Sequence, residues 1–312
     1  MRSPRVQGKA RRRRSTTSRL GEHALRRRFC RLLSSDPDGA LQRMSHDGKI
    51  ILNSDDLFPI LPEYANTPKE RPVLGPLLYS VARRFIDRSF KNLLSRQLRK
   101  DKTVVFTAGG SATGKSTMLR VAGATPGVDF VVDTTFSDTR RAFSQVGRAL
   151  KSGRKVAIYY VYRGFRQCVI SMIRRTLNPA SGRLVPIDDM ARTHFGAQRT
   201  ILAALEKYQH NKNVFILLTA NAGPRTLSIL TETEFETQLH DSVDALQRLG
   251  QTVLDELHKG KGGNRSRSDQ NQNSRRKGLR ISYSLYKAAQ SKAQKAKPTA
   301  RKSNARRSAK SA

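Results

Sequence analysis

Residues 101–119 read DKTVVFTAGGSATGKSTML, and this stretch decides the fold. It begins with a short apolar run that predicts a buried strand, and a glycine-rich turn follows. Gly109 and, after four further residues, Gly114–Ser116 match the phosphate-binding loop pattern G-x-x-x-x-G-K-[ST]. The residues after Ser116 are typical of a helix start, so the loop lies between a strand and a helix, as this pattern requires.

The chemistry of a phosphate loop explains the spacing. Glycines allow consecutive backbone N–H groups to turn inward around a phosphate without Cβ clashes. Lys115 can reach the β- and γ-phosphates, the hydroxyl of Ser116 can ligate Mg²⁺, and the helix N-terminus faces the anion. The alternative is a Gly/Ser loop with an exposed lysine. We expect these loop residues to bind the nucleotide: Gly109, Gly110, Ser111, Ala112, Thr113, Gly114, Lys115, Ser116 and Thr117.

The charge of the chain is concentrated at its two ends. The 312 residues carry a formal net charge of +36. Residues 1–35 hold twelve Lys/Arg and one Glu, and residues 259–312 hold seventeen Lys/Arg and one Asp, so residues 36–258 carry only +9. We therefore expect a disordered basic arm over 1–35, with a short helix near 20–33, a folded domain over 36–258 and a disordered basic tail over 259–312.

Two interpretations of the basic ends remain open. One is non-specific contact with nucleic acid, and the other is solubility or general association with polyanions. The two cysteines, Cys30 and Cys168, belong to no CxxC or Cys/His cluster, so the sequence supports no zinc site and favours a reducing compartment. No apolar run approaches the length of a membrane span, and no hydrophobic segment follows the N-terminal arginines. We expect a cytoplasmic protein without a membrane partner.

Five apolar runs between turn signals predict five strands. They lie at residues 49–52, 104–106, 128–132, 156–162 and 214–218. Helical periodicity predicts helices near residues 74–98, 137–150, 167–175, 187–208 and 239–257. Strands that alternate with helices predict a three-layer α/β domain with a mainly parallel sheet, of the P-loop NTPase or kinase type. Ligands of such sheets bind at the carboxyl ends of the strands, where Asp55, Asp133 and Arg163 lie.

Several of these segments together resemble the zeta toxin family of P-loop kinases, which includes UDP-N-acetylglucosamine kinases. The resemblance covers roughly residues 48–222. The segments that carry it are the loop Thr107–Thr117, Val132–Thr135 at a strand end, Tyr160–Arg163, Gly182–Pro186 and Ala191–His194.

One departure from the family order is large. In the family a strand ending I-[DN]-x-D-x-[FL] follows the phosphate-loop helix, and its last Asp is the general base. Here eleven residues separate Thr117 from Asp129, which is too few for that strand and its helix. Ile51–Leu57 matches the pattern but precedes the loop. We therefore expect a permuted order in which the resemblance makes Asp55 the base, with Asp56 as its substitute.

The resemblance also implies roles for other residues. Asp133, with Thr135, corresponds to an acidic substrate-binding position, and Arg163 and Arg183 correspond to arginines that clamp the transferring phosphoryl group. Each role has a non-catalytic alternative. Asp55 or Asp133 could cap the following helix, and the arginines could be solvated surface residues.

Two further pairs have weaker expected roles. Arg192 and His194 are expected to contact substrate, and His194 is expected to be structural or substrate-contacting rather than a metal ligand. Asn221 and Gly223 follow the last predicted strand, where P-loop kinases often pass the adenine.

These observations lead to one principal functional hypothesis. The chain is expected to be an ATP- and Mg²⁺-dependent kinase that phosphorylates a hydroxyl of a small acceptor, by resemblance a UDP-activated amino sugar, and that has a toxin-like role with an antitoxin as partner. One alternative is a nucleic-acid-binding protein whose P-loop domain is nucleotide-gated or degenerate. Another is a kinase that acts on a nucleic acid end or on a different small metabolite.

Overall fold

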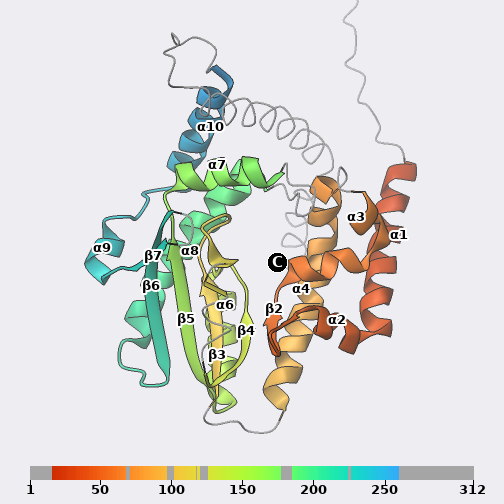
Figure 1. Cartoon of the computed structure of the whole chain (residues 1–312), viewed down its shortest axis with the longest axis horizontal. Helices are drawn as coiled ribbons and strands as arrows, with labels where there is room; N and C mark the ends of the chain where they lie inside the picture. Colours follow the sequence, from red (N-terminus) through yellow and green to blue (C-terminus); the bar gives the residue numbers. More distant parts are fainter. Residues whose placement is uncertain are drawn as a thin grey trace, which may run out of the picture.

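The computed structural model describes residues 16–67, 71–96, 102–116, 118–119, 126–176, 185–223 and 226–259 of the chain. Within these residues a seven-stranded sheet has the order β1-β2-β4-β3-β5-β6-β7 (Figure 1). The strands are β1 (Ser45–His46), β2 (Lys49–Leu52), β3 (Thr103–Ala108), β4 (Val128–Val132), β5 (Lys155–Tyr162), β6 (Val214–Gly223) and β7 (Thr226–Ile229). The helices are α1 (Thr16–Ser35), α2 (Pro37–Arg43), the 3₁₀ helix η1 (Ser54–Ile60), α3 (Pro62–Asn66), α4 (Arg71–Ser95), α6 (Thr139–Lys151), α7 (Phe165–Thr176), α8 (Ile187–Tyr208), α9 (Glu232–Glu236) and α10 (Val243–Lys259).

The predicted fold class is confirmed. The five predicted strands correspond to β2, β3, β4, β5 and β6, which pair in parallel. Two strands at the edges, β1 and β7, pair antiparallel, and no pattern in the sequence predicts them. β1 contains two residues and β7 four, too few for a period-2 pattern to be visible.

The central strand β3 is buried on both faces, as its continuous apolar run predicts. Successive strand side chains point to opposite faces of a sheet. Val104 and Phe106 therefore join a core cluster with residues of α4, α6 and α8, whereas Val105 packs with Val131 and Ala157 on the other face. The phosphate loop follows β3 at the carboxyl end of this buried strand.

The N-terminal region contains a longer helix than the short one expected near residues 20–33 of the basic arm. Residues Thr16–Ser35 form α1, and Phe29 and Leu33 of this helix are buried in the core cluster. α1 contacts α4, and the Arg26 side chain donates from Nε to the carbonyl of Leu77 at 2.9 Å. The apolar stripe thus outweighs the high density of arginine, because full burial of one large apolar side chain contributes about 1.5–3 kcal/mol. Residues 1–15 and 260–312 lie outside the described residues.

Strand β2 belongs to the same parallel sheet as the strand before the phosphate loop. It precedes β3 in the chain, yet it lies on the far side of β4 from β3, parallel to β4, with Leu52 opposite Val132. In Figure 1 β2 lies beside the group formed by α1, α2, α3 and α4. The segment before the phosphate loop is therefore part of the same sheet.

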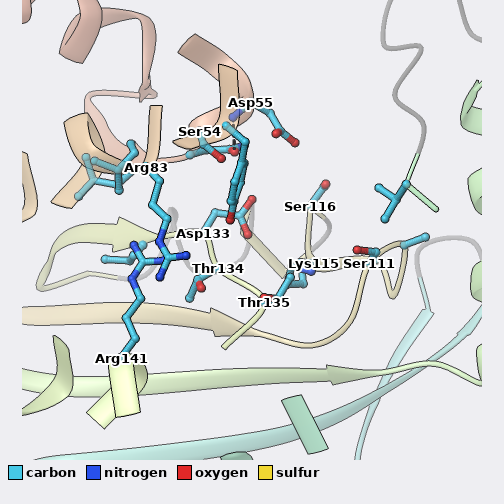
Figure 2. A pocket seen from close by; sticks show the side chains of 18 of the residues that line it. Ser54, Asp55, Arg83, Ser111, Lys115, Ser116, Asp133, Thr134, Thr135 and Arg141 are labelled. Atoms are coloured by element: carbon cyan, nitrogen blue, oxygen red, sulfur yellow. Dashed lines mark hydrogen bonds between the residues drawn. The ribbon is translucent and has the colours of Figure 1, made fainter. Parts of the chain in front are cut away.

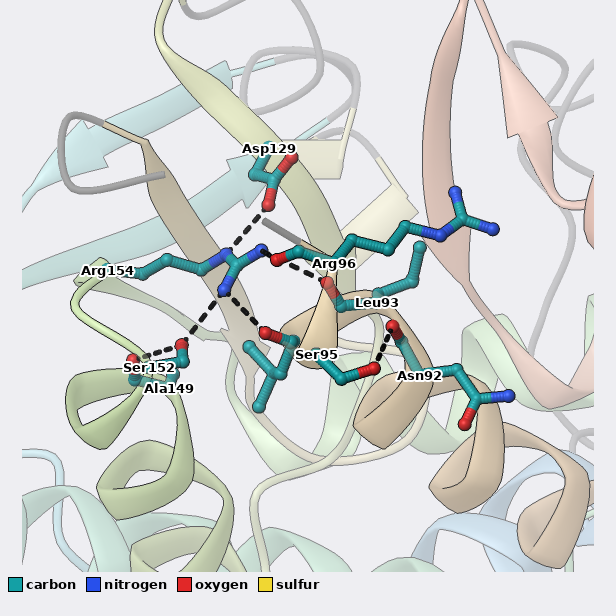
Figure 3. Close-up of polar contacts among 9 residues, drawn as sticks. Asn92, Leu93, Ser95, Arg96, Asp129, Ala149, Ser152 and Arg154 are labelled. Atoms are coloured by element: carbon teal, nitrogen blue, oxygen red, sulfur yellow. Dashed lines mark hydrogen bonds and ion pairs between the residues drawn. The ribbon is translucent and has the colours of Figure 1, made fainter. Parts of the chain in front are cut away.

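A buried arginine joins α4 to the sheet (Figure 3). Arg154, at the start of β5, donates from Nε to Asp129 Oδ2 of β4 at 2.8 Å. Its two terminal nitrogens each donate at 3.0 Å to main-chain carbonyls at the end of α4, those of Leu93 and Leu94. A cation at a helix C-terminus satisfies carbonyls that have no partner within the helix. Arg154 thereby fixes the position of α4 relative to β4 and β5.

Within the residues that the structure describes, every helix is too short or too polar to cross a membrane.

Candidate active site

The phosphate loop has the backbone conformation that its glycines predict. Gly109 has φ +132° and Gly114 has φ +103°, a region that side chains with a Cβ disfavour. A Cβ on Gly109 would lie 2.5 Å from the carbonyl oxygen of Val161 on β5. Ala112 also adopts a positive φ, +64°, although it has a Cβ. Such a conformation in a short polar loop is typical of a binding site.

Lys115 is partly buried at the centre of this loop. Its Nζ donates to the carbonyl oxygens of Gly109 at 2.9 Å and Gly110 at 2.8 Å. Burial lowers the pKa of Lys115, and the nearby Asp133 carboxylate opposes that shift. The Lys115 ammonium is therefore fixed by main-chain oxygens of the loop itself and lies close to the Asp133 carboxylate.

A cavity at the carboxyl ends of β2, β3 and β4 is lined by residues from all three strand ends (Figure 2). Parallel pairing brings these ends together, and the Asp133 N–H donates to the Leu52 carbonyl at 3.0 Å. The lining includes Asp55 after β2 and Ser116 in the loop. The other predicted site residues in the lining are Ser111, Ala112, Gly114, Lys115, Asp133 and Thr135.

Asp133 is oriented toward the cavity by a hydroxyl on the neighbouring strand. Thr107 Oγ1 of β3 donates to Asp133 Oδ1 at 2.7 Å, and the same hydroxyl accepts from the Thr134 N–H at 3.2 Å. Asp133 does not cap the next helix, because Asp138 is the N-cap of α6 and accepts from the Arg141 N–H. The capping alternative for Asp133 is therefore wrong.

The two adjacent carboxylates after β2 point to different places. Asn53 is the N-cap of η1 and accepts from the Asp55 N–H at 2.9 Å, so Asp55 is not the cap. Asp55 lines the cavity, and in Figure 2 its side chain lies above Asp133. Asp56 instead lies 3.6 Å from His46 Nε2 of β1. Burial raises the pKa of Asp56, and its hydrogen bond with His46 opposes this.

Several predicted site residues do not line this cavity. The main-chain carbonyl of Arg163 accepts from Cys168 Sγ at 3.5 Å, and the Arg163 side chain lies outside the lining. Arg192 is exposed and pairs with Asp189 one helical turn away. Arg183 and the side chain of Thr117 lie outside the described residues.

His194 and Asn221 both contact the phosphate loop. His194 is buried, and a Cβ on Gly110 would lie 2.7 Å from its Nδ1, so the imidazole packs directly against the loop. Burial, with His240 nearby, lowers the pKa of His194 to about 3. Asn221 Nδ2 donates to the Thr113 carbonyl at 2.9 Å. These contacts fit the structural interpretation of His194.

Four side chains that the sequence does not single out also line the cavity: Tyr79, Arg83, Arg141 and Arg175. Arg175 lies close enough to lower the pKa of Lys115 further. The spacing of apolar residues predicts only that residues such as Arg83 are polar positions on α4. It carries no signal that distinguishes a cavity-lining arginine from a solvated one.

The fold and the loop define this protein as a P-loop α/β protein with acidic residues facing the loop. Residues 122–229, about a third of the chain, match the family model described as Zeta toxin. The match confirms the resemblance to the zeta toxin family that the motifs predict. It begins after the phosphate loop and runs from before β4 to the end of β7.

Comparisons with other proteins give structural similarities at low identity. No curated protein sequence matches the chain. A native AvrRxo1-ORF1:AvrRxo1-ORF2 complex is 14% identical, with 74% of this chain and 92% of that chain covered and a TM-score of 0.41. The same complex with ATP is 12% identical, with 77% of this chain and 94% of that chain covered and a TM-score of 0.39. A structure of the PezAT chromosomal toxin–antitoxin system of Streptococcus pneumoniae is 12% identical. It covers 79% of this chain and 98% of that chain, with a TM-score of 0.35. The family match and the phosphate loop together support an ATP-using phosphotransferase.

Proposed function

We propose that this protein transfers the γ-phosphate of ATP to a hydroxyl of a small acceptor. The observation that carries the proposal is that Asp55 and Lys115, which come from separate strand ends, line one cavity with Asp133 between them. A phosphate-binding loop alone would explain nucleotide binding. A carboxylate that faces the loop across a cavity adds a group that can accept a proton from a bound hydroxyl.

In the proposed reaction Asp55 takes the proton of the acceptor hydroxyl as its oxygen attacks the γ-phosphorus of ATP. The new P–O bond forms, the bond to the β-phosphate oxygen breaks, and ADP leaves. Lys115 and Arg175 offset the charge on the phosphoryl oxygens, since catalysis of such transfers is mostly positioning and electrostatic stabilisation. Roles for Arg163 and Arg183 in the same clamp remain part of the proposal.

Mg²⁺ fits the oxygen atoms of this site. Ser116 Oγ and the Asp133 carboxylate, which both line the cavity, are the hard oxygen ligands that this ion prefers. A bound Mg²⁺ would neutralise charge on the β- and γ-phosphates. Ser116 is the proposed direct ligand, and Asp133 is proposed to bind the acceptor or a metal-bound water.

The specific acceptor that we propose is a UDP-activated amino sugar, and the support for it is the resemblance to the zeta toxin family. An antitoxin partner is proposed on the same ground. Cytoplasmic location and non-specific nucleic acid contact through the basic ends also remain proposals.

The proposal is tested with the full chain, Mg²⁺ and γ-labelled ATP against a panel of hydroxyl acceptors that includes UDP-N-acetylglucosamine. We expect label transfer to at least one acceptor. Equal transfer by the parent and by Asp55→Asn would contradict the role of Asp55. ATP binding without transfer to any acceptor, together with tight salt-dependent binding of nucleic acid, would favour the nucleic-acid-binding alternative.

That alternative also predicts loss of binding when the basic ends are removed. The N-terminal truncation should end at residue 15, because Phe29 and Leu33 of α1 are buried in the core. A cut at residue 35 would remove these side chains and confuse loss of function with loss of the fold.

A further inference from the structure

A second cavity lies at the amino ends of the parallel strands. The first residues of β3, β4 and β5, which are Thr103, Val128 and Lys155, all line it. The other described residues of its lining are Pro126, Val156, Ala157, Tyr159, Lys212, Asn213 and Phe215. Because β3 runs through six residues, roughly 17 Å of strand separates this second cavity from the phosphate loop. A molecule bound there leaves the candidate active site open.

The floor of the second cavity is apolar. Ala157 of β5 is the register partner of Phe215 of β6, so both side chains lie on one face of the sheet. The rings of Tyr159 and Phe215 pack edge to face, with centroids 6.5 Å apart, yet Phe215 is still 56% exposed. The cavity measures about 220 Å³, and a cavity of about 150 Å³ accepts benzene. It therefore has room for one large apolar side chain of a partner.

Exposed apolar surface continues from this cavity along β6 and β7. Alternate residues of a strand share a face, so Phe215 and Thr219 lie on the same face of β6, roughly 13 Å apart. Ile229 of β7 is the register partner of Thr219 and is 75% exposed. Two of the most exposed large apolar side chains among the described residues, Phe215 and Ile229, thus share one face. Apolar surface of this kind, with a polar rim, marks a protein interaction site.

The rim of the second cavity indicates the chemistry of the partner. Lys155 and Lys212 are exposed and line it, and no described residue of the lining is acidic. A second copy of this chain, packed face to face, would bring the same lysines against them. Residues 259–312 of the chain itself carry a charge of +16 and would also place like charges together. Carboxylates of a partner would instead complement the lysines.

We propose that the second cavity binds an acidic segment of a partner protein. One large apolar side chain of the partner inserts against Phe215 and Tyr159, and carboxylates on either side of it pair with Lys155 and Lys212. This arrangement has the apolar centre and the charged rim of a protein interface, with Phe215 as the anchor. The inference does not depend on the proposed phosphotransfer, because the cavity lies at the other end of the strands.

A synthetic peptide tests the proposal. The probe is a fluorescein-labelled peptide with the sequence Glu-Leu-Glu-Trp-Glu-Leu-Glu, and its binding to the full chain is measured by fluorescence anisotropy at physiological ionic strength. Phe215→Ser should lower the affinity at least about tenfold, as expected when an aromatic anchor is removed. Since more than half of the Phe215 surface is exposed, the variant should keep its fold, and thermal unfolding checks this.

Charge reversal provides a second variant with a matched control. Lys212→Glu should lower the affinity at least about fivefold. Lys151→Glu changes the net charge equally at an exposed position outside the lining, and it should stay within about twofold of the parent. A peptide with lysine in place of every glutamate should bind Lys212→Glu better than it binds the parent. Equal affinity in Lys212→Glu and Lys151→Glu, or parent affinity in Phe215→Ser, would overturn the site.

Other occupants give different results. A dimer in analytical ultracentrifugation that Phe215→Ser abolishes would assign the cavity to a second copy. Tighter probe binding after Ile281→Ser and Tyr283→Ser in the full chain would assign it to the C-terminal segment, whose large apolar residues lie at 279–286. Either result would overturn the acidic partner. Saturating probe should leave the affinity for AMP-PNP unchanged, and competition between them would place the peptide at the phosphate loop and refute the second cavity as its site.

Discussion

The side-chain amide of Asn221 donates to the main-chain carbonyl of Thr113 at 2.9 Å and thereby joins β6 to the phosphate loop across 108 residues of sequence. The fit is close, because a Cβ on Gly114 would lie 2.0 Å from Asn221 Nδ2. Asn221 also accepts from the Gly223 N–H at 3.2 Å, which fixes its amide orientation. The contact therefore supports the loop from the last parallel strand.

Asn221→Ala should loosen the loop without unfolding the protein. Loss of one partly buried hydrogen bond costs about 1 kcal/mol, which corresponds to a rise of about fivefold in the KM for ATP if the cost falls on nucleotide binding. The measurement is steady-state kinetics against ATP. Asn213→Ala, just before β6 and exposed, is the control and should leave KM unchanged. Equal KM values in the two variants would show that the contact does not support binding.

Lys115→Ala should reduce phosphate transfer by about 10²–10³-fold, because a preorganised positive group at the phosphates is removed. Its ammonium is held by the carbonyls of Gly109 and Gly110, so the alanine variant also leaves these oxygens to water. Transfer is measured with labelled ATP, and nucleotide affinity by calorimetry. Lys151→Ala, on the exposed end of α6, provides the matched control. A Lys115→Ala protein with parent activity would exclude the loop from catalysis.

Asp55→Asn should bind ATP normally but lose about 10²–10⁴-fold in the rate of transfer, as expected when a general base is removed. Asp56→Asn is a sharp control, because its carboxylate faces His46 and not the cavity. We expect Asp56→Asn to retain most of its activity. The opposite result, with Asp56→Asn inactive and Asp55→Asn active, would reverse the assignment of the base.

The strands were the most predictable part of this protein, for a physical reason. Central parallel strands are buried on both faces, so runs such as Val156–Tyr162 are apolar throughout and end abruptly at polar residues. α8 has the predicted bounds, 187–208, because its apolar positions recur at helical spacing. The edge strands were less predictable, since strands of two and four residues show no clear period. α1 was predicted only in part, as a short helix near residues 20–33 within a basic arm.

The cavity lining was only partly predictable. Asp55, Lys115 and Asp133 adjoin strand ends, where chain position indicates the site directly. Arg163 also follows a strand end, yet in this part of the chain the arginine that lines the cavity is Arg175, at the far end of α7. Which arginine reaches the cavity depends on how α7 packs across the sheet. That packing involves residues distant in sequence, so no local pattern encodes it.

Arg154→Met should destabilise the fold by about 3–5 kcal/mol, the cost typical of breaking a buried ion pair, since the fully buried guanidinium and its pairing with Asp129 are lost. The variant also loses donors to the carbonyls of Leu93 and Leu94 at the end of α4. Urea unfolding of parent and variant measures the change. Arg148→Met, exposed on α6, should change stability by less than about 0.5 kcal/mol. An Arg154→Met protein as stable as the Arg148→Met control would refute a structural role for this network.

Lowering the pH should destabilise the protein through His194. Burial lowers the pKa of this histidine from 6.5 to about 3, so below pH 6.5 the unfolded chain binds a proton that the folded chain does not. The free energy of unfolding should therefore fall as the pH falls from 6.5 toward 3, by at most about 1.4 kcal/mol per pH unit for one group. His240, whose pKa burial also lowers, adds in the same direction.

Urea unfolding at several pH values between 7 and 5 measures this slope. His194→Gln should flatten it whatever its effect on absolute stability, because the substituted side chain binds no proton. His23→Gln, on the exposed face of α1, should keep the parent slope. A His194→Gln protein with the parent slope would mean that the imidazole behind Gly110 takes up its proton equally in both states, and the buried contact with the phosphate loop would then need another description.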